Sequence, residues 1–130
     1  MARCLNRIEL IGVVTTTPTV IDENPLGVKF KLATFKTFYS KKKQEYVKQT
    51  EFHLVKVWNR DAEFVYNRIE KNERLYVEGE MHYYEKTFDD GRMIQKPEVM
   101  AKNIIKLSNW KTQEQKNEEE QEKSDDVYKA

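Results

Sequence analysis

The chain changes its hydrophobic period between EYVKQTEFHLVKVW, residues 45–58, and NRDAEFVYNRIEKN, residues 59–72. In the first segment successive residues alternate between two faces, with Val55 and Val57 on one of them, which predicts a β-strand. In the second segment the apolar residues recur three and four positions apart, which predicts an amphipathic helix. The sequence therefore predicts a long strand that runs directly into a helix.

Both ends of the predicted helix carry boundary signals. Asn59 is predicted to be the N-cap, and Asp61 and Glu63 suit the positive end of the helix dipole. Lys71 falls in the predicted last turn, and Asn72 can adopt the left-handed conformation that ends a helix. The helix is thus expected to stop just before the next alternating segment.

Alternating segments flank this strand and helix on both sides. Two precede them, at residues 5–14 and 28–37, and two follow, at residues 75–86 and in a last stretch that ends near residue 107. The turn signal Asp89-Asp90-Gly91 separates the last two strands. Three strands, a helix and two strands is the order of the OB-fold, an all-β five-stranded Greek-key barrel with one helix between strands 3 and 4.

Charge and composition divide the chain into two parts. Residues 1–110 hold 19 Lys and Arg against 15 Asp and Glu, a net charge of +4, and are predicted to form one OB-fold domain. Residues 111–130 hold 4 against 7, a net charge of −3, and are predicted to be a disordered acidic tail because they have almost no apolar residues to bury. Within the domain, the stretch at 15–27 is expected to be irregular, since Pro18 and Pro25 favour turns.

Several function classes are disfavoured by what the sequence lacks. No run of about 18 apolar residues exists, so no membrane span is expected. Cys4, His53 and His82 are the only soft metal ligands, and no two of them have ligand spacing, so no metal site is expected. Because there is also no nucleophile elbow and no Gly-rich phosphate loop, we expect neither a cofactor nor enzymatic activity.

One face of the predicted third strand interleaves aromatic rings with lysines. Phe52 and Trp58 lie six residues apart, which is about 20 Å along an extended strand, and Lys48 and Lys56 share their parity. Bases stack on such rings with about 1–3 kcal/mol each, while lysines contact phosphates. For this strand taken alone, packing of the same rings under a loop or a subunit remains an equal alternative.

Two further segments repeat the pattern. The predicted second strand ends in aromatic residues just before the cationic loop Lys41-Lys42-Lys43, and one face of the predicted fourth strand is again aromatic and cationic. Its members are Tyr76, His82, Tyr84, Lys86 and Phe88. Three strands that each place rings beside cations favour nucleic-acid binding over packing.

Four segments resemble the bacterial and mitochondrial single-stranded DNA-binding protein family, in the family's order and spacing. The opening LNRIELIG, residues 5–12, is similar to V-N-R-V-x-L-I-G, and FKLAT, residues 30–34, is similar to F-S-L-A-T. QTEFH, residues 49–53, is similar to Q-T-E-W-H, and YVEG, residues 76–79, matches Y-V-E-G. The resemblance covers about residues 4–107.

The resemblance implies sequence-independent single-stranded DNA binding and protection during DNA replication, repair and recombination. It implies a homotetramer around which the DNA wraps, with His53 at the subunit interface. The family's fourth-strand aromatic aligns with Lys86, so Tyr84 or Phe88 is expected to replace it. The predicted DNA-binding residues are Phe38, Phe52, Trp58, Tyr84, Phe88, Lys41, Lys42, Lys43, Lys48, Lys56 and Lys86.

Origin and partners are less narrowly defined by the resemblance. Asn24-Pro25 and the segment NIIKLS, residues 103–108, are closer to mitochondrial members, which implies the mitochondrial matrix and its nucleoid, with the bacterial cytoplasm as the alternative. Bacterial members end in an acidic tip closing with Pro-Phe that recruits replication and repair enzymes. This chain ends SDDVYKA instead, so recruitment of replication proteins stays open.

Two other functions remain as alternatives. The first is a different OB-fold nucleic-acid binder, such as a primosomal helper or an RNA-binding module, which would prefer a structured RNA or one defined partner. The second is an interaction protein whose aromatic residues form an oligomer interface and which binds no oligonucleotide. A parallel titration with oligo-dT, duplex DNA and structured RNA distinguishes these functions.

Overall fold

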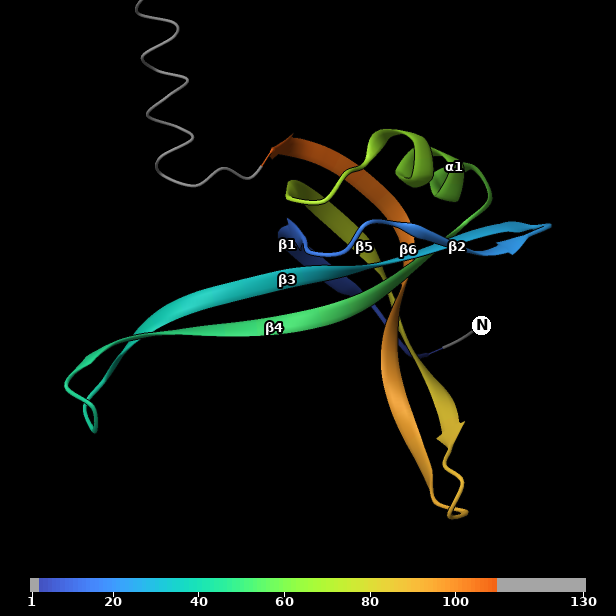
Figure 1. The fold of residues 1–130 in the computed structure, drawn as a ribbon. Coiled ribbons are helices and arrows are strands. Elements are labelled where there is room, and N and C mark those ends of the chain that lie inside the picture. The colour runs from blue at the N-terminus through green and yellow to red at the C-terminus, as the bar shows by residue number, and fades with distance from the viewer. Residues whose placement is uncertain (1–2, 110–130) are drawn as a thin grey trace, which may run out of the picture.

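The computed structural model describes residues 3–109 and is a closed barrel with two protruding hairpins (Figure 1). Its elements are β1 (Ile8–Val14), β2 (Thr19–Glu23), β3 (Leu26–Ser40), β4 (Glu45–Trp58), α1 (Asn59–Arg68), β5 (Glu73–Thr87) and β6 (Met93–Asn109). The sheet order is β1-β5-β6-β4-β3-β2, and β1 also pairs with β3, so five strands close on themselves. The predicted OB-fold, with its helix between the third and fourth barrel strands, is confirmed.

One cluster of apolar side chains fills the barrel. Val55 and Val57 are fully buried, so the predicted inner face of β4 is confirmed, and Phe30 supplies the largest buried ring. Ala62 and Val65 bury one stripe of α1 against the same cluster. Each such side chain contributes about 1.5–3 kcal/mol by leaving water, apart from the smaller alanine, so this cluster holds the strands in their register.

The barrel closes where β1 crosses β3, and a glycine permits that crossing. A Cβ atom at Gly12 would lie 2.3 Å from the carbonyl oxygen of Ala33. The two backbones can therefore approach only because residue 12 has no side chain. The adjacent pairing of Val13 with Ala33 completes the closure.

Two hairpins extend beyond the barrel and are visible at the lower left and lower right of Figure 1. We call residues 34–51, the outer parts of β3 and β4, the β3–β4 arm. We call residues 82–98, the outer parts of β5 and β6, the β5–β6 arm. Both arms are continuous antiparallel ladders that turn at residues 41–44 and 88–92, which leaves both faces of each arm outside the barrel core.

The sequence predicted an irregular stretch at residues 15–27, and this prediction is wrong, because the stretch contains β2. Val20 pairs with Val28 at the start of β3, and the ladder continues to Glu23 opposite Leu26. The β-branched run Thr19–Ile21 favours an extended backbone, and the turn at Asn24-Pro25 folds it back on β3. The turn residues thus connect two strands instead of marking a loop without strands.

The ends of the helix also differ from the prediction. The N-cap is Trp58, with no side-chain capping hydrogen bond, and Asn59 instead adopts a left-handed φ of 59°. Asparagine tolerates this conformation, which lets β4 turn directly into α1. The helix ends at Arg68, so Lys71 is not in its last turn. Asn72 does adopt a left-handed φ, 77°, but in the turn before β5, where its N–H donates to the carbonyl of Val14 at 2.7 Å.

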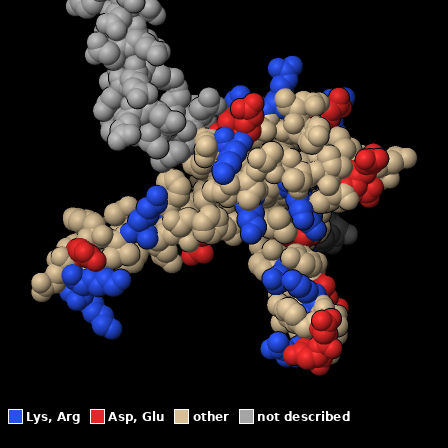
Figure 2. Space-filling model, viewed as in Figure 1, with Lys and Arg blue, Asp and Glu red and all other residues tan. Residues whose placement is uncertain are grey.

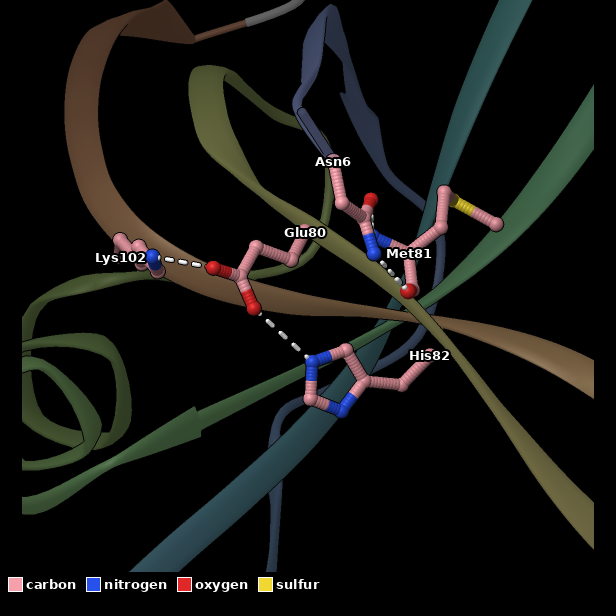
Figure 3. A network of polar contacts seen from close by, with 5 residues as sticks. All are labelled: Asn6, Glu80, Met81, His82 and Lys102. Atoms are coloured by element: carbon pink, nitrogen blue, oxygen red, sulfur yellow. Dashed lines mark hydrogen bonds and ion pairs between the residues drawn. The ribbon is translucent and has the colours of Figure 1, made fainter. Parts of the chain in front are cut away.

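A polar network fixes the start of the chain to β5 at the base of the β5–β6 arm (Figure 3). The Asn6 amide donates to the carbonyl of Met81 at 2.7 Å and accepts from its N–H at 2.9 Å, as a paired strand would. Next to it, Glu80 pairs with Lys102 and with Nε2 of His82. The pKa of Glu80 is lowered from its ordinary value, most strongly by the hydrogen bond from Lys102 and next by the hydrogen bond from His82.

The described range contains no helix with the length and apolar character that a membrane crossing requires. The predicted acidic tail, residues 111–130, and Trp110 lie outside the described residues.

Candidate nucleic-acid interface

The register between β3 and β4 determines which side chains share the outward face of the barrel. Residues paired across two strands point to the same side of a sheet. Phe52 pairs with Ala33, and Lys56 pairs with Lys29. Phe52 is 63% exposed, in contrast to the fully buried Val55 on the other face. The outward face of β4 therefore carries aromatic and cationic side chains in the alternation that the sequence predicted.

Trp58 ends β4 and is half-buried. Its ring lies against Gly27, its partner across the β3–β4 ladder, so closely that a Cβ atom at residue 27 would lie 2.5 Å from Cζ3 of the indole. The contact places part of the ring against backbone and leaves the rest accessible. Trp58 thus packs against backbone and still has accessible ring surface, and base stacking on it stays a prediction.

Phe38 lies on the opposite face of the β3–β4 arm from Phe52. It pairs with Val47, which has the parity of the inner face of β4. Beyond the barrel that face has no core to cover it, and Phe38 is 43% exposed. The arm therefore presents aromatic rings on both of its faces, instead of one strip.

The outward face of the β3–β4 arm includes a ring that the sequence analysis left out of the candidate set. Phe35 pairs with Thr50 and shares the face of Phe52, and the ammonium of Lys48 lies 4.3 Å from the centroid of the Phe35 ring. This is a cation–π contact. The parity of β3, with Phe30 inward and Phe35 outward, was the signal that could have identified it.

Lysines occupy the end of the same arm. Lys41, Lys42 and Lys43 are exposed in the turn, and the N–H of Lys43 donates to Oγ of Ser40 at 3.2 Å. Figure 2 shows Lys and Arg side chains gathered at this tip. Three adjacent cations in solvent attract a polyanion without selecting its sequence.

The two candidate aromatics of the β5–β6 arm lie in different places. Tyr84 is beside β4, with the ammonium of Lys56 at 5.1 Å from its ring centroid. Phe88 is at the turn of the β5–β6 arm, and its ring centroid lies 5.5 Å from the ammonium of Lys86 and 5.4 Å from the guanidinium carbon of Arg92. The structure thus brings Tyr84 to the outward face of β4 and leaves Phe88 and Lys86 at the end of the arm.

Lys56 has a partner that the sequence analysis did not identify. Its ammonium lies 2.6 Å from Oε2 of Glu98 on β6, and Glu98 is only 8% exposed. That oxygen accepts no well-aligned hydrogen bond from the described residues, so the contact is ionic. Separating such a pair leaves a buried charge uncompensated, at a typical cost of about 3–5 kcal/mol, against about 1 kcal/mol at most for an exposed ion pair.

Lys29 and Lys31 complete the cationic outward face and were also left out of the candidate set. They pair with Lys56 and Leu54, respectively, and both are exposed. The alternation of β3 could have identified them, because Lys29 and Lys31 flank the inward-pointing Phe30 and therefore point outward. Neither makes an ion pair with another residue in the range 3–109, so the charge of both lysines is available.

His53 lies at the base of the β3–β4 arm, with its Nε2 2.9 Å from Oγ1 of Thr34. Burial lowers the pKa of His53 from its ordinary value, and the carboxylate of Glu51 opposes part of that shift. The role at a subunit interface that the resemblance implies for His53 stays a prediction.

Comparisons with known proteins agree with this geometry. The model of the "Single-strand binding protein family" matches residues 5–107. The chain is 33% identical over 119 residues to the mitochondrial single-stranded DNA-binding protein of Bos taurus, covering 83% of this chain and 78% of that one. The counterpart from Oryctolagus cuniculus is 31% identical over the same shares.

Solved structures agree at the level of the fold. A Plasmodium falciparum SSB in complex with ssDNA superposes with a TM-score of 0.74 at 23% identity, covering 83% of this chain and 99% of that one. A deletion mutant of the single-stranded DNA binding protein from Thermus aquaticus has a TM-score of 0.68 at 26% identity, covering 83% of this chain and 53% of that one. The resemblance stated from the sequence is confirmed: the chain belongs to the single-strand binding protein family.

Proposed function

We propose that this protein binds single-stranded DNA without reading its sequence and protects it during replication, repair and recombination. The observation that carries the proposal is the outward face of β4, where exposed Phe52 and half-buried Trp58 alternate with lysines. Every base has a π-face, so stacking accepts any sequence, and the exposed lysines of the β3–β4 arm neutralise phosphates. The protein acts by binding alone, without catalysis.

The proposed DNA path begins at the lysine turn of the β3–β4 arm. It follows the outward face of β4 past Phe52 to Trp58 and continues to Tyr84 on β5. Phe38 contacts DNA on the other face of the β3–β4 arm. Phe88 and Lys86 contact DNA at the end of the β5–β6 arm. The strand registers and the cation–π contacts support this order.

A parallel titration tests the proposal. Oligo-dT, duplex DNA and a structured RNA of equal length are titrated under one salt concentration. We expect oligo-dT to bind at least about tenfold more tightly than the duplex, because only unpaired bases offer their π-faces. Preference for the structured RNA would favour another OB-fold binder, and absence of oligonucleotide binding would favour an interaction protein.

We also propose a homotetramer, with His53 near a subunit interface. A row of two isoleucines and one tyrosine ring crosses the outward face of three strands, since Ile11 pairs with Tyr76 and Tyr76 pairs with Ile105. Ile11 is 52% and Ile105 is 48% exposed, and such a row in water suits contact with another copy. Sedimentation at micromolar concentration should give one species near four chain masses, and a stable monomer would contradict the proposal.

The mitochondrial matrix and its nucleoid are the proposed location, with replication proteins as further partners. The support is that the relatives from Bos taurus and Oryctolagus cuniculus are both named as mitochondrial. Imaging of the tagged protein against a stain for mitochondrial DNA should show coincident foci. A diffuse signal outside mitochondria would favour the alternative of a bacterial-type cytoplasmic protein.

A further inference from the structure

We propose that Glu98 withholds Lys56 from DNA phosphates and holds its ammonium against one side of the Tyr84 ring, leaving the other side for a base. Lys56 is then a positioning residue and not a phosphate contact. The inference rests on the proposed function and deepens it, because it separates the lysines that neutralise DNA from the one that supports a stacking ring.

The three residues come from three neighbouring strands at the base of the β5–β6 arm. β4 and β6 run parallel there, with Val55 opposite Val99, which brings Lys56 beside Glu98. The Lys56 ammonium lies 2.6 Å from Oε2 of Glu98 and 5.1 Å from the ring centroid of Tyr84. One cation therefore contacts both a carboxylate on β6 and a ring on β5.

The carboxylate is the stronger competitor for this lysine. Glu98 is nearly buried, and within residues 3–109 its Oε2 accepts no aligned hydrogen bond, so the Lys56 ammonium is the counter-charge that compensates it. A phosphate arriving from solvent would gain one exposed contact and leave a buried charge unpaired. We therefore expect Lys56 to stay on Glu98 when DNA binds.

Lys29 is the contrasting residue at the same level of the sheet. It stands directly across from Lys56, is exposed, and has no carboxylate within 4.0 Å among the described residues. Like charges on opposite positions of a ladder repel, and Glu98 relieves that repulsion by neutralising Lys56. Of the paired residues Lys29 and Lys56, only Lys29 thus offers its charge to DNA.

The salt dependence of oligo-dT affinity tests this assignment, because the slope of log K against log salt changes by about 0.7 for each phosphate contact on a single strand. Lys29→Gln should make the slope less negative by about 0.7 per engaged chain. The double variant Lys56→Gln with Glu98→Gln should keep the wild-type slope, since it removes a pair of zero net charge. Glu98→Gln alone should make the slope more negative by about 0.7, because it frees Lys56.

The double variant leaves no unpaired buried charge, and thermal melting checks that it folds. Glu98→Gln keeps the size of the side chain, and its salt slope is an independent second measurement. A double variant with the shallower slope of Lys29→Gln, or a Glu98→Gln variant with an unchanged slope, would overturn the inference. Those results would leave the proposed function intact, whereas failure of the wild-type protein to bind oligo-dT would overturn the function itself.

The ring that Lys56 supports gives a separate readout. Tyr84→Ala should weaken oligo-dT binding about 5- to 150-fold without changing the salt slope, and Tyr84→Phe should keep most of the affinity. Equal affinity of Tyr84→Ala and the wild-type protein would show that no base uses the ring, and the proposed positioning role of Lys56 would be wrong.

Discussion

The indole of Trp58 lies against Gly27 across the β3–β4 ladder, with Cζ3 2.5 Å from the position that a Cβ atom at residue 27 would occupy. The glycine thus provides the space in which the ring sits, and the ring is fixed before any ligand arrives. A ring already in place loses little conformational entropy when a base stacks on it.

Gly27→Ala tests whether this placement matters for binding. The added methyl group must displace the indole, so we expect oligo-dT binding to weaken. The expected loss is at most that of one base stack, about 1–3 kcal/mol. Overpacking should also lower the melting temperature. Ala62→Val is the control, because it overpacks the core beneath α1, away from the proposed DNA path. It should lower stability and leave affinity unchanged. Wild-type affinity for Gly27→Ala would show that the position of Trp58 is unimportant.

The lysine turn predicts a change in salt dependence. Replacing Lys41, Lys42 and Lys43 together by Gln should make the slope of log K against log salt less negative by up to about 2, at about 0.7 for each lost phosphate contact. A variant with the same change of net charge on and after α1 is the control: Arg60→Gln, Arg68→Gln and Lys71→Gln. If both triple variants shift the slope equally, the DNA path does not pass the turn.

Phe38 and Phe52 lie on opposite faces of the β3–β4 arm, and their effects should be independent. Each change to Ala should cost about 1–3 kcal/mol of single-strand affinity, and the double variant should show the sum, because the rings share no partner. Phe64→Ala, which removes an exposed ring on α1, should bind as the wild-type protein does. An affinity loss for only one face would mean that DNA passes along one side of the arm.

Protonation of His53 should destabilise the fold. Burial lowers its pKa in the folded state, so below the unfolded value of about 6.5 the unfolded chain binds more protons than the folded one. The contribution of neutral His53 is therefore complete above that pH and is lost as the pH falls through the folded pKa.

Thermal melting between about pH 8 and pH 5 measures this effect. The melting temperature of the wild-type protein should fall on acidification, and His53→Gln should show a weaker fall. His82→Gln, which changes a more exposed histidine, serves as the control. A pH dependence that is identical for the wild-type protein and His53→Gln would contradict the assignment.

Local periodicity explains what could be predicted from the sequence. Alternation placed Val55 and Val57 inward and Phe52 outward, and the change of period after Trp58 located the helix, because both signals depend on neighbours in the chain. β2 was missed because Pro18 and Pro25 suggested a loop, although the β-branched run between them pairs with β3.

Relationships between distant strands could not be predicted in this way. The ion pair of Lys56 with Glu98 depends on the parallel register of β4 and β6, which no local pattern contains. Lys56 was therefore assigned to phosphate contact from its parity alone. The exposure of Phe38 likewise depends on how far the arm extends beyond the barrel, since its parity alone matches that of the buried Phe30.

The most direct test of base stacking is the emission of Trp58. Trp110 is the only other tryptophan, so the Trp110→Phe variant reports Trp58 alone. Titration of this variant with oligo-dT should quench its fluorescence with the same midpoint as binding measured by sedimentation. Trp58→Phe in the otherwise wild-type chain should keep most of the affinity and lose most of the quenching. Full binding of oligo-dT with unchanged Trp58 emission would contradict the account, because a stacked base must contact the indole.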